Sequence, residues 1–202
     1  RSLFDPATAP ERLQEEDFEV GREEVERLER LVADLRRMAV ASLDLVDVPL
    51  LALCERAERL LRDALGDRAL ELDVPAATVI RCDPDKATQM LVNLLSNAID
   101  AVNPSGRIGV RLRAPIGDGA ATLQVWDTGA GFGQAAPAQL FAPWFTTKNN
   151  GTGLGLAITH RLVRSHGWSI TATREAGTTS FDIELPIAAV RHVAPASTVG
   201  AA

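Results

Sequence analysis

Beyond Ser42 the chain alternates between short strand-like runs and amphipathic helical stretches, and this order limits its possible folds more than any other feature. Alternating apolar residues predict strands, whereas apolar residues three and four positions apart predict helices. Strands are expected at 43–46, 70–74, 78–82, 107–113, 121–126, 168–173 and 178–185. Helices are expected at 49–65, 83–102 and 152–165. Strands grouped with helices on one side predict an α+β fold, a two-layer α/β sandwich with a mixed sheet.

Local signals mark where several of these elements begin and end. Asp83 before Pro84 predicts an N-cap followed by the first helical position, and Gly66 predicts the end of the helix at 49–65. The segment 129–150 has no periodicity and carries a glycine cluster at each end. A loop of about twenty residues inside a compact domain is commonly functional. We therefore expect a mobile lid that is hinged at its glycines.

The first residues follow a different pattern, a long helix over about 11–42 with a narrow apolar seam. Residues of the seam alternate three and four positions apart: Val25, Leu28, Val32, Leu35 and Ala39. Such a stripe can pack on its own domain or bundle with another chain, and its place at one end favours the second. We expect an associating helix at 1–42, a folded domain at 43–187 and a flexible tail at 188–202.

Composition excludes several classes of protein. With 202 residues and 46% hydrophobic content the chain can fill one core, and a net charge of −6 gives no basic excess for a nucleic-acid partner. No apolar run approaches the roughly 20 residues of a membrane span, so no membrane contact is expected here. Cys54 and Cys82 lack metal or redox spacing, which predicts buried thiols and a cytoplasmic location. A start at Arg1 suggests part of a longer protein, which could itself be membrane-attached.

Two polar features are candidates for binding chemistry. Asn93 and Asn97 stand one turn apart on the helix at 83–102 and share a face, which alone is typical of a solvated surface. Asp127 ends a strand and is followed by Gly129 and Gly131. A carboxylate there can accept a hydrogen bond from an exocyclic amine, and glycines let a flat base approach the backbone. An ordinary Asp turn is the alternative.

The third feature is a glycine run that leads into the helix at 152–165. Gly151, Gly153 and Gly155 follow Lys148 at alternate positions. The free N–H groups of a helix start suit phosphate, although glycine clusters are more often turns. A dinucleotide fingerprint is excluded because Leu156 occupies the place of its third glycine, and no phosphate-loop G-x-x-x-x-G-K-[ST] pattern occurs.

Taken in order, these segments resemble the conserved boxes of sensor histidine kinases. Residues 93–101, 127–132, 140–148 and 151–157 look like the N box, the first glycine box, the F box and the second glycine box. The resemblance spans about 43–187, the catalytic ATP-binding domain, and is most similar to the nitrogen-regulation type of sensor kinase. The seam at 23–39 resembles the second helix of the dimerisation and phosphotransfer hairpin, whose first helix is missing.

The resemblance implies a Bergerat fold, in which a mixed sheet backs three helices and holds ATP or ADP under a lid. Asn97 would ligand Mg²⁺ and Asn93 would support the phosphates, and both would be catalytic together with Lys148. Asp127 would accept the adenine amine, with Gly129 and Gly131 making room for the ring. Phe141 and Phe145 would anchor the lid. The remaining nucleotide contacts would come from Lys148, Gly151, Thr152, Gly153, Leu154, Gly155 and Thr179.

The implied activity is transfer of the ATP γ-phosphoryl group to a histidine on a dimerisation hairpin, for relay to a cognate response regulator. A homodimer through the N-terminal helix is also implied. The chain departs from the family in one respect, because none of its histidines sits in a His-Glu context before the seam: His160, His166 and His192. We expect them to be surface or packing residues, so that the phosphoacceptor lies outside this sequence.

Two other functions stay open at this point. ATPases of the same superfamily, such as gyrase and Hsp90-like proteins, carry Glu where Asn93 stands, because hydrolysis needs a carboxylate to take a proton from water. Asp100 lies nearly two turns further along and is a poor substitute, so hydrolysis should be slow. Alternatively, the chain could be a degenerate regulatory module that binds nucleotide or only dimerises.

Overall fold

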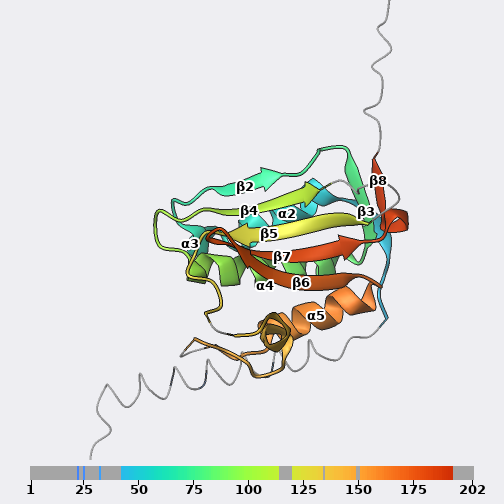
Figure 1. Ribbon diagram of the computed structural model, residues 1–202. Coiled ribbons are helices and arrows are strands. Elements are labelled where there is room, and N and C mark those ends of the chain that lie inside the picture. Colours follow the sequence, from blue (N-terminus) through green and yellow to red (C-terminus); the bar gives the residue numbers. More distant parts are fainter. Residues whose placement is uncertain are drawn as a thin grey trace, which may run out of the picture.

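The computed structural model describes residues 42–113, 120–133, 135–148 and 151–192, together with the single residues Arg22, Val25 and Val32. A five-stranded sheet forms one layer, with strand order β2-β4-β5-β7-β6 (Figure 1). β2 runs parallel to β4, and the other neighbours are antiparallel. The strands are β2 (Leu70–Asp73), β4 (Ile108–Arg113), β5 (Ala121–Asp127), β6 (Ser169–Glu175) and β7 (Thr178–Leu185).

Helices cover one face of this sheet and form the second layer (Figure 1). They are α2 (Leu50–Leu60), α3 (Arg62–Leu65), α4 (Pro84–Ala101) and α5 (Gly155–Ser165). Leu53, Leu94 and Leu162 of the helices are buried in one core with inward-facing residues of the central strands. The predicted mixed sheet backed by three main helices is confirmed, and the short α3 is added to it.

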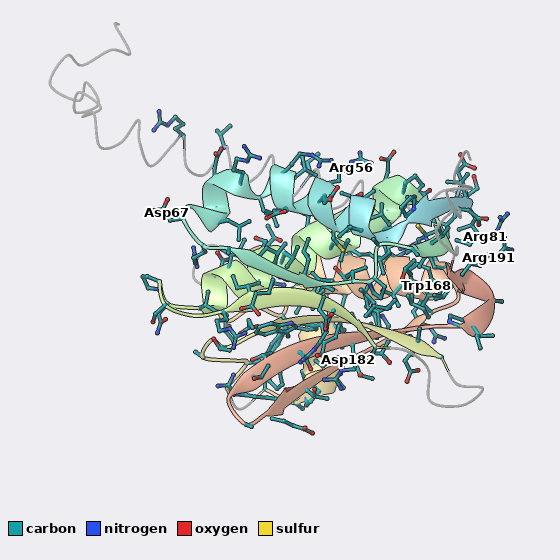
Figure 2. All side chains as sticks on the ribbon, turned by 90° about the horizontal axis from the view of Figure 1, so that it is seen from above. Arg56, Asp67, Arg81, Trp168, Asp182 and Arg191 are labelled. Atoms are coloured by element: carbon teal, nitrogen blue, oxygen red, sulfur yellow. The ribbon has the colours of Figure 1, made fainter. Side chains whose placement is uncertain are left out.

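The other face of the sheet is polar. Gln124 of β5 accepts a hydrogen bond from Arg111 of β4 and donates one to Asp182 of β7. Figure 2 shows Asp182 on the side of the sheet away from α2, which carries Arg56. Because side chains alternate across a strand, residues one position away from these polar groups enter the core.

A second, smaller sheet was not predicted. It has the order β1-β3-β8, formed by β1 (Val46–Pro49), β3 (Thr78–Cys82) and β8 (Val190–His192). The expected flexible tail at 188–202 is therefore wrong for its first residues, because β8 pairs antiparallel with β3 and follows the 3₁₀ turn η3 (Ile187–Ala189). Residues 193–202 lie outside the described part of the chain.

Charged side chains hold this small sheet together at one end of the molecule. Arg81 of β3 and Arg191 of β8 both pair with the carboxylate of Asp47 in β1, at 3.4 and 3.2 Å. The two arginines lie side by side in Figure 2. All three side chains are exposed, so the pairs contribute at most about 1 kcal/mol each.

Several predicted boundaries need correction. The strand expected at 43–46 lies at Val46–Pro49, and the helix expected at 49–65 is interrupted at Leu61, whose ψ of 10° departs from the helical value. The helix expected at 152–165 begins at Gly155. Asp83 caps α4 as predicted, because its carboxylate accepts the N–H groups of residues 85 and 86. The long N-terminal helix lies outside the described residues except at three positions.

Both cysteines are free and buried, as expected. Burial raises the pKa of Cys54 to about 12 and that of Cys82 to about 12. Both thiols are therefore protonated and unreactive at neutral pH. Within the described residues, no helix is long and apolar enough to cross a bilayer.

His166 joins the end of α5 to the start of α4. Its Nδ1–H donates to the Leu162 carbonyl at 2.8 Å, so Nε2 is free to accept the N–H of Asp83 at 3.1 Å. Its ring lies against Trp168, with 4.6 Å between centroids. Burial lowers the pKa of His166 below its ordinary value of 6.5. The side chain therefore packs as a neutral acceptor, as expected for a structural histidine.

This contact predicts a pH-dependent stability. A protonated imidazole cannot accept the N–H of Asp83, so His166 binds a proton more readily in the unfolded chain than in the folded one. The free energy of unfolding therefore falls as the pH drops through the lowered pKa of His166. His166→Gln lacks this ionisation. Between about pH 7 and about pH 5, the free energy of unfolding measured with denaturant should fall more in the parent than in the variant. Equal losses in both chains would contradict the assignment.

Candidate functional site

A cavity of about 270 Å³ opens between the polar face of α4, the end of the sheet and the segment that precedes α5. This volume is close to the lower end of the range for small-molecule sites, about 300–1,000 Å³. Ten of the twelve residues predicted for the site line it: Asn93, Asn97, Asp127, Gly131, Lys148, Gly151, Thr152, Gly153, Gly155 and Thr179. Segments far apart in the sequence are therefore brought to one place.

The other two predicted residues do not line the cavity. Leu154 is fully buried, and its side chain belongs to the hydrophobic core rather than to the cavity. Gly129 lies behind the wall, where its N–H donates to Asp127 Oδ1 at 2.8 Å. Leu154 was included because it stands between two glycines of the run. Its apolar side chain packs in the core and thereby anchors the start of α5.

Asp127 lies at the end of β5 and is only 3% exposed. Burial raises the pKa of its carboxyl group, while the Gly129 N–H bond and the nearby positive charge of Arg174 oppose that rise. A carboxylate has two oxygens and about four acceptor positions, so the Gly129 bond leaves capacity for a ligand donor. A buried acceptor that faces a cavity is suited to bind an amine.

The two glycines after Asp127 are required by close packing. A Cβ at Gly129 would collide with the backbone carbonyl of Ala101 at the end of α4. Gly131 has a φ of +74°, and a Cβ there would collide with the guanidinium group of Arg174. Only glycine satisfies both constraints, so this loop is held flush against the wall of the cavity.

On α4, Asn93 and Asn97 both face the cavity, which confirms their predicted shared face. Asn93 Nδ2 donates to the Gly155 carbonyl at 3.2 Å and to Thr159 Oγ1 at 3.3 Å. The amide nitrogen of Asn93 therefore ties α4 to the first turn of α5. This leaves the side-chain oxygen of Asn93 as its group for the cavity.

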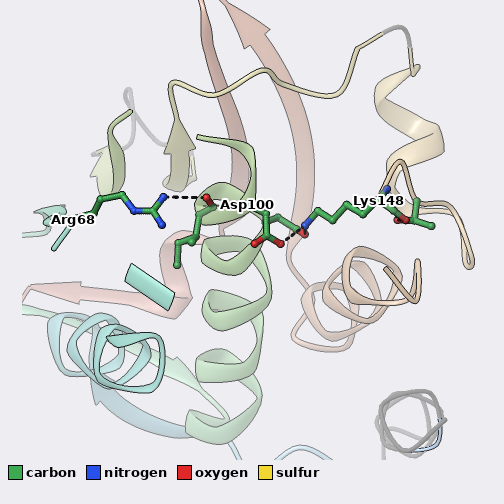
Figure 3. A network of polar contacts seen from close by, with 6 residues as sticks. Arg68, Asp100 and Lys148 are labelled. Atoms are coloured by element: carbon green, nitrogen blue, oxygen red, sulfur yellow. Dashed lines mark hydrogen bonds and ion pairs between the residues drawn. The ribbon is translucent and has the colours of Figure 1, made fainter. Parts of the chain in front are cut away.

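Lys148 bridges from the lid to α4. Its Nζ donates to Asn97 Oδ1 at 3.0 Å and pairs with Asp100 Oδ2 at 2.6 Å, as Figure 3 shows beside the Arg68 contact with the same helix. The side chains of Lys148 and Asp100 are 43% and 51% exposed. Such an exposed pair contributes at most about 1 kcal/mol, so a ligand can displace it. The role of Asp100 as the lysine's partner was not predicted.

The lid is anchored by apolar side chains, as predicted. Leu140 of the 3₁₀ turn η2 (Pro137–Phe141) is buried, and Phe141 and Phe145 pack against the core. The Phe141 ring lies 5.3 Å from the ring of His160. His160 is therefore a packing residue of α5, which agrees with the expectation for this histidine.

Gly153 joins the lid to the start of α5. Its φ is +68°, and a Cβ there would lie 2.5 Å from the carbonyl carbon of Trp144. Trp144 itself has a φ of +69° and is 58% exposed. The second glycine of the run is thus required by direct contact between two backbone segments, in addition to any contact with a ligand.

One residue of the site, Arg174, was missed. Arg174 Nη1 donates to Thr179 Oγ1 at 2.8 Å and to the Gly129 carbonyl at 3.0 Å. The signal that could have found it is the tight turn between β6 and β7, which sets Arg174 opposite Thr179. Period-two alternation then places both residues on the helix-covered face.

Comparison with known proteins shows the family of the chain. The sequence profile of the histidine kinase-, DNA gyrase B- and HSP90-like ATPases matches residues 82–189, more than half of the chain. The chain belongs to this ATPase family. Within the family, the chain is similar to sensor histidine kinases.

Three relatives illustrate this similarity. The sensor histidine kinase ZraS of Escherichia coli K12 is 34% identical over 174 residues, which cover 84% of this chain and 37% of the relative. The sensory histidine kinase/phosphatase NtrB of Rhodobacter capsulatus is 35% identical over 117 residues, 52% of this chain and 33% of the relative. The Acinetobacter baumannii histidine kinase AdeS matches with a TM-score of 0.70 at 26% identity, covering 86% of this chain and 85% of that structure. The matched part of this chain spans about a third of the length of each of these two curated relatives.

Proposed function

We propose that this chain binds ATP with Mg²⁺ in the cavity and transfers the γ-phosphoryl group to a histidine on a dimerisation hairpin. One observation carries the proposal. Asp127 lines the cavity as a buried acceptor, and Asn97 of α4 and Lys148 of the lid, which are hydrogen-bonded to each other, line the same cavity. An adenine nucleotide needs these two kinds of group at its two ends.

At the base end, the carboxylate of Asp127 accepts the exocyclic amine of adenine. Because Gly129 and Gly131 carry no side chains, their loop packs directly against Ala101 and Arg174 and does not project into the space that the base would take. Thr179 lies beside Asp127 in the neighbouring strand and lines the same cavity. Its hydroxyl group adds a second polar contact to the base edge.

At the phosphate end, hard oxygen atoms and positive groups meet. Mg²⁺ prefers a few oxygen ligands together with phosphate oxygens, and Asn97 Oδ1 fits this preference. Bound there, Mg²⁺ would neutralise charge on the transferred phosphoryl group. Asn93 supports the phosphates through its side-chain oxygen, by way of the metal or a water, because its nitrogen is already committed to α5.

The start of α5 and Lys148 complete the phosphate end. Leu154, the N-cap of α5, offers no side-chain acceptor to the first-turn N–H groups, and such groups bind anions. Lys148 leaves Asn97 and pairs with the γ-phosphate when nucleotide binds. The acceptor imidazole nitrogen then attacks the γ-phosphorus, the bond to the β–γ bridging oxygen breaks, and ADP leaves.

Partners and location follow from the same proposal. The acceptor histidine is not among the residues of this sequence, and a cognate response regulator takes the phosphoryl group from it. Val25 and Val32, two seam residues that the structure describes, are 55% and 49% exposed, which supports a homodimer through the N-terminal helix. ATP as the substrate requires that this segment lie in the cytoplasm.

Two alternatives are less well supported by the site. An ATPase needs a carboxylate to activate water, but the N-box position that lines the cavity is an amide, Asn93, and Asp100 is paired with Lys148. A regulatory module that only dimerises would need neither the cavity nor its lysine, whereas a module that binds nucleotide differs from the kinase in lacking the transfer reaction. Slow release of inorganic phosphate therefore separates the kinase from the ATPase.

The transfer reaction can be tested directly with γ-³²P-labelled ATP and Mg²⁺. Alone, the chain should acquire no acid-labile, alkali-stable label, because none of its three histidines is placed as a phosphoacceptor. Label of that kind should appear on a separately supplied dimerisation hairpin from a sensor kinase of the same type.

The controls decide between the three functions. A hairpin with its acceptor His→Ala should stay unlabelled, which rules out non-specific transfer. Rapid phosphate release without labelling would support the ATPase, and nucleotide binding without either reaction would support the regulatory module. Either result would overturn the kinase proposal.

A further inference from the structure

A row of polar side chains crosses the end of the sheet at the base end of the cavity. The strand register sets Asp127 of β5 opposite Thr179 of β7, and Thr179 opposite Arg174 of β6. Asp127 and Thr179 are each 3% exposed and both line the cavity. Arg174 follows them in the row but does not line the cavity, so it acts on any ligand through its neighbours.

Arg174 links two segments beside the cavity through hydrogen bonds from one nitrogen atom. Its Nη1 donates to Thr179 Oγ1 at 2.8 Å and to the Gly129 carbonyl at 3.0 Å. Its guanidinium group also fills the space next to Gly131 where a side chain would otherwise stand. The contact with Gly129 fixes the loop that donates to Asp127 Oδ1. The positions of the Thr179 hydroxyl and of the Asp127 carboxylate therefore both depend on Arg174.

The contact with Thr179 limits what the hydroxyl group can do. A threonine hydroxyl has one proton to donate and two positions at which it can accept. Arg174 is a permanent donor and has no acceptor, so it occupies an accepting position of the hydroxyl. The proton of Thr179 then points away from Arg174 and is available to a ligand that offers an acceptor.

Purine bases differ at the atoms that would meet this pair. Adenine has an amine at C6 and an unprotonated N1, so it offers one donor and one acceptor. A 6-oxopurine such as hypoxanthine has a carbonyl at C6 and an N1–H, which is the reverse pattern. An ionised Asp127 and a donating Thr179 match adenine and oppose the 6-oxopurine.

We propose that Arg174 is a positioning residue that makes the site select 6-aminopurine over 6-oxopurine nucleotides, by holding Thr179 as a donor and Asp127 in its loop. This inference rests on the proposed nucleotide-binding function. A site that mismatches a polar edge leaves buried groups unpaired, which is an effective way to reject a similar ligand.

The test measures the affinities of ADP and IDP for the intact chain and its variants by calorimetry. Arg174→Met should lower the ADP-to-IDP preference by roughly 5- to 10-fold, the effect of losing one oriented hydrogen bond. Arg174→Lys keeps a positive donor and should retain most of the preference. Arg81→Met, an exposed strand arginine outside the cavity lining, is the matched control and should leave both affinities unchanged.

A second variant covers the case in which Arg174→Met does not fold. Thr179→Val keeps the shape of a buried side chain without its hydroxyl group, and it should lower the same preference. Equal weakening of ADP and IDP in both variants would show a purely structural role and overturn the inference. Equal affinity of the unsubstituted chain for ADP and IDP would overturn it while leaving nucleotide binding intact. Failure of that chain to bind ADP at all would overturn the proposed function as well.

Discussion

Replacement of Asp127 by Ala or Asn should reduce ADP affinity at least about 100-fold, because a hydrogen bond to a charged acceptor is lost and a base amine is left unpaired in a buried site. Asp127→Asn is the sharper variant. Its amide oxygen can still accept the N–H of Gly129, so the loop is preserved while the negative charge is removed. Isothermal titration with ADP measures the loss.

A loss of ADP affinity in Asp127→Asn would not come from a loss of folding stability. Burial raises the pKa of Asp127, so the folded state favours the protonated carboxyl group and the free energy of unfolding falls as the pH rises through that pKa. Asn is neutral at pH 7 and avoids this loss of stability. The variant should unfold at the same or a higher denaturant concentration. Asp182→Asn, on the opposite face of the same sheet, is the matched control and should bind ADP normally. Unchanged ADP affinity in Asp127→Asn would refute the adenine assignment.

Replacement of Asn97 by Ala should remove the Mg²⁺ dependence of nucleotide binding and lower phosphotransfer to a supplied hairpin about 100- to 1,000-fold, the usual effect of losing one charge-stabilising contact in a transition state. The physical reason is the loss of the side-chain oxygen that meets the metal. ADP titrations with and without Mg²⁺, together with transfer rates, measure both effects. Metal-free ADP binding should stay close to that of the parent.

Asn97→Ala also removes the hydrogen bond from Lys148 Nζ to Asn97, and loss of that bond could produce the same result as loss of the metal ligand. A second variant separates these two causes. Asp100→Asn removes the carboxylate that pairs with Lys148 Nζ at 2.6 Å but keeps the oxygen of Asn97. Its Mg²⁺ dependence should be retained. If Asp100→Asn lost the dependence while Asn97→Ala kept it, the metal ligand would be Asp100 instead.

The fold was predictable wherever the local sequence carries its own signal. Asp83 and Pro84 mark the start of α4 because capping depends on neighbouring residues alone. The strand Thr78–Cys82 has a clear alternating pattern and lies where expected. By contrast, β8 has only three residues and pairs with β3 from about a hundred residues away. Three residues are too few to show an alternating pattern, so the pairing of β8 with β3 is determined by tertiary packing rather than by local sequence.

The same distinction explains the site. Asn93, Asn97 and Asp127 could be predicted to share one cavity because their motifs are local and ordered along the chain. Arg174 was missed because its role depends on a strand register, and the partner of Lys148 was missed because the lid has no local pattern that shows where it folds. Leu154 differs from the two asparagines and Asp127 because its side chain is buried in the core, and a motif does not show which of its side chains serve the core.

The most direct test of the account is a structure of this chain bound to Mg²⁺ and a non-hydrolysable ATP analogue. The adenine amine should lie within hydrogen-bonding distance of Asp127, and Mg²⁺ should bind Asn97 Oδ1. Lys148 Nζ should have moved from Asn97 to the γ-phosphate. A nucleotide bound outside the cavity, or one inside it with Lys148 still on Asn97 and no metal there, would contradict the account.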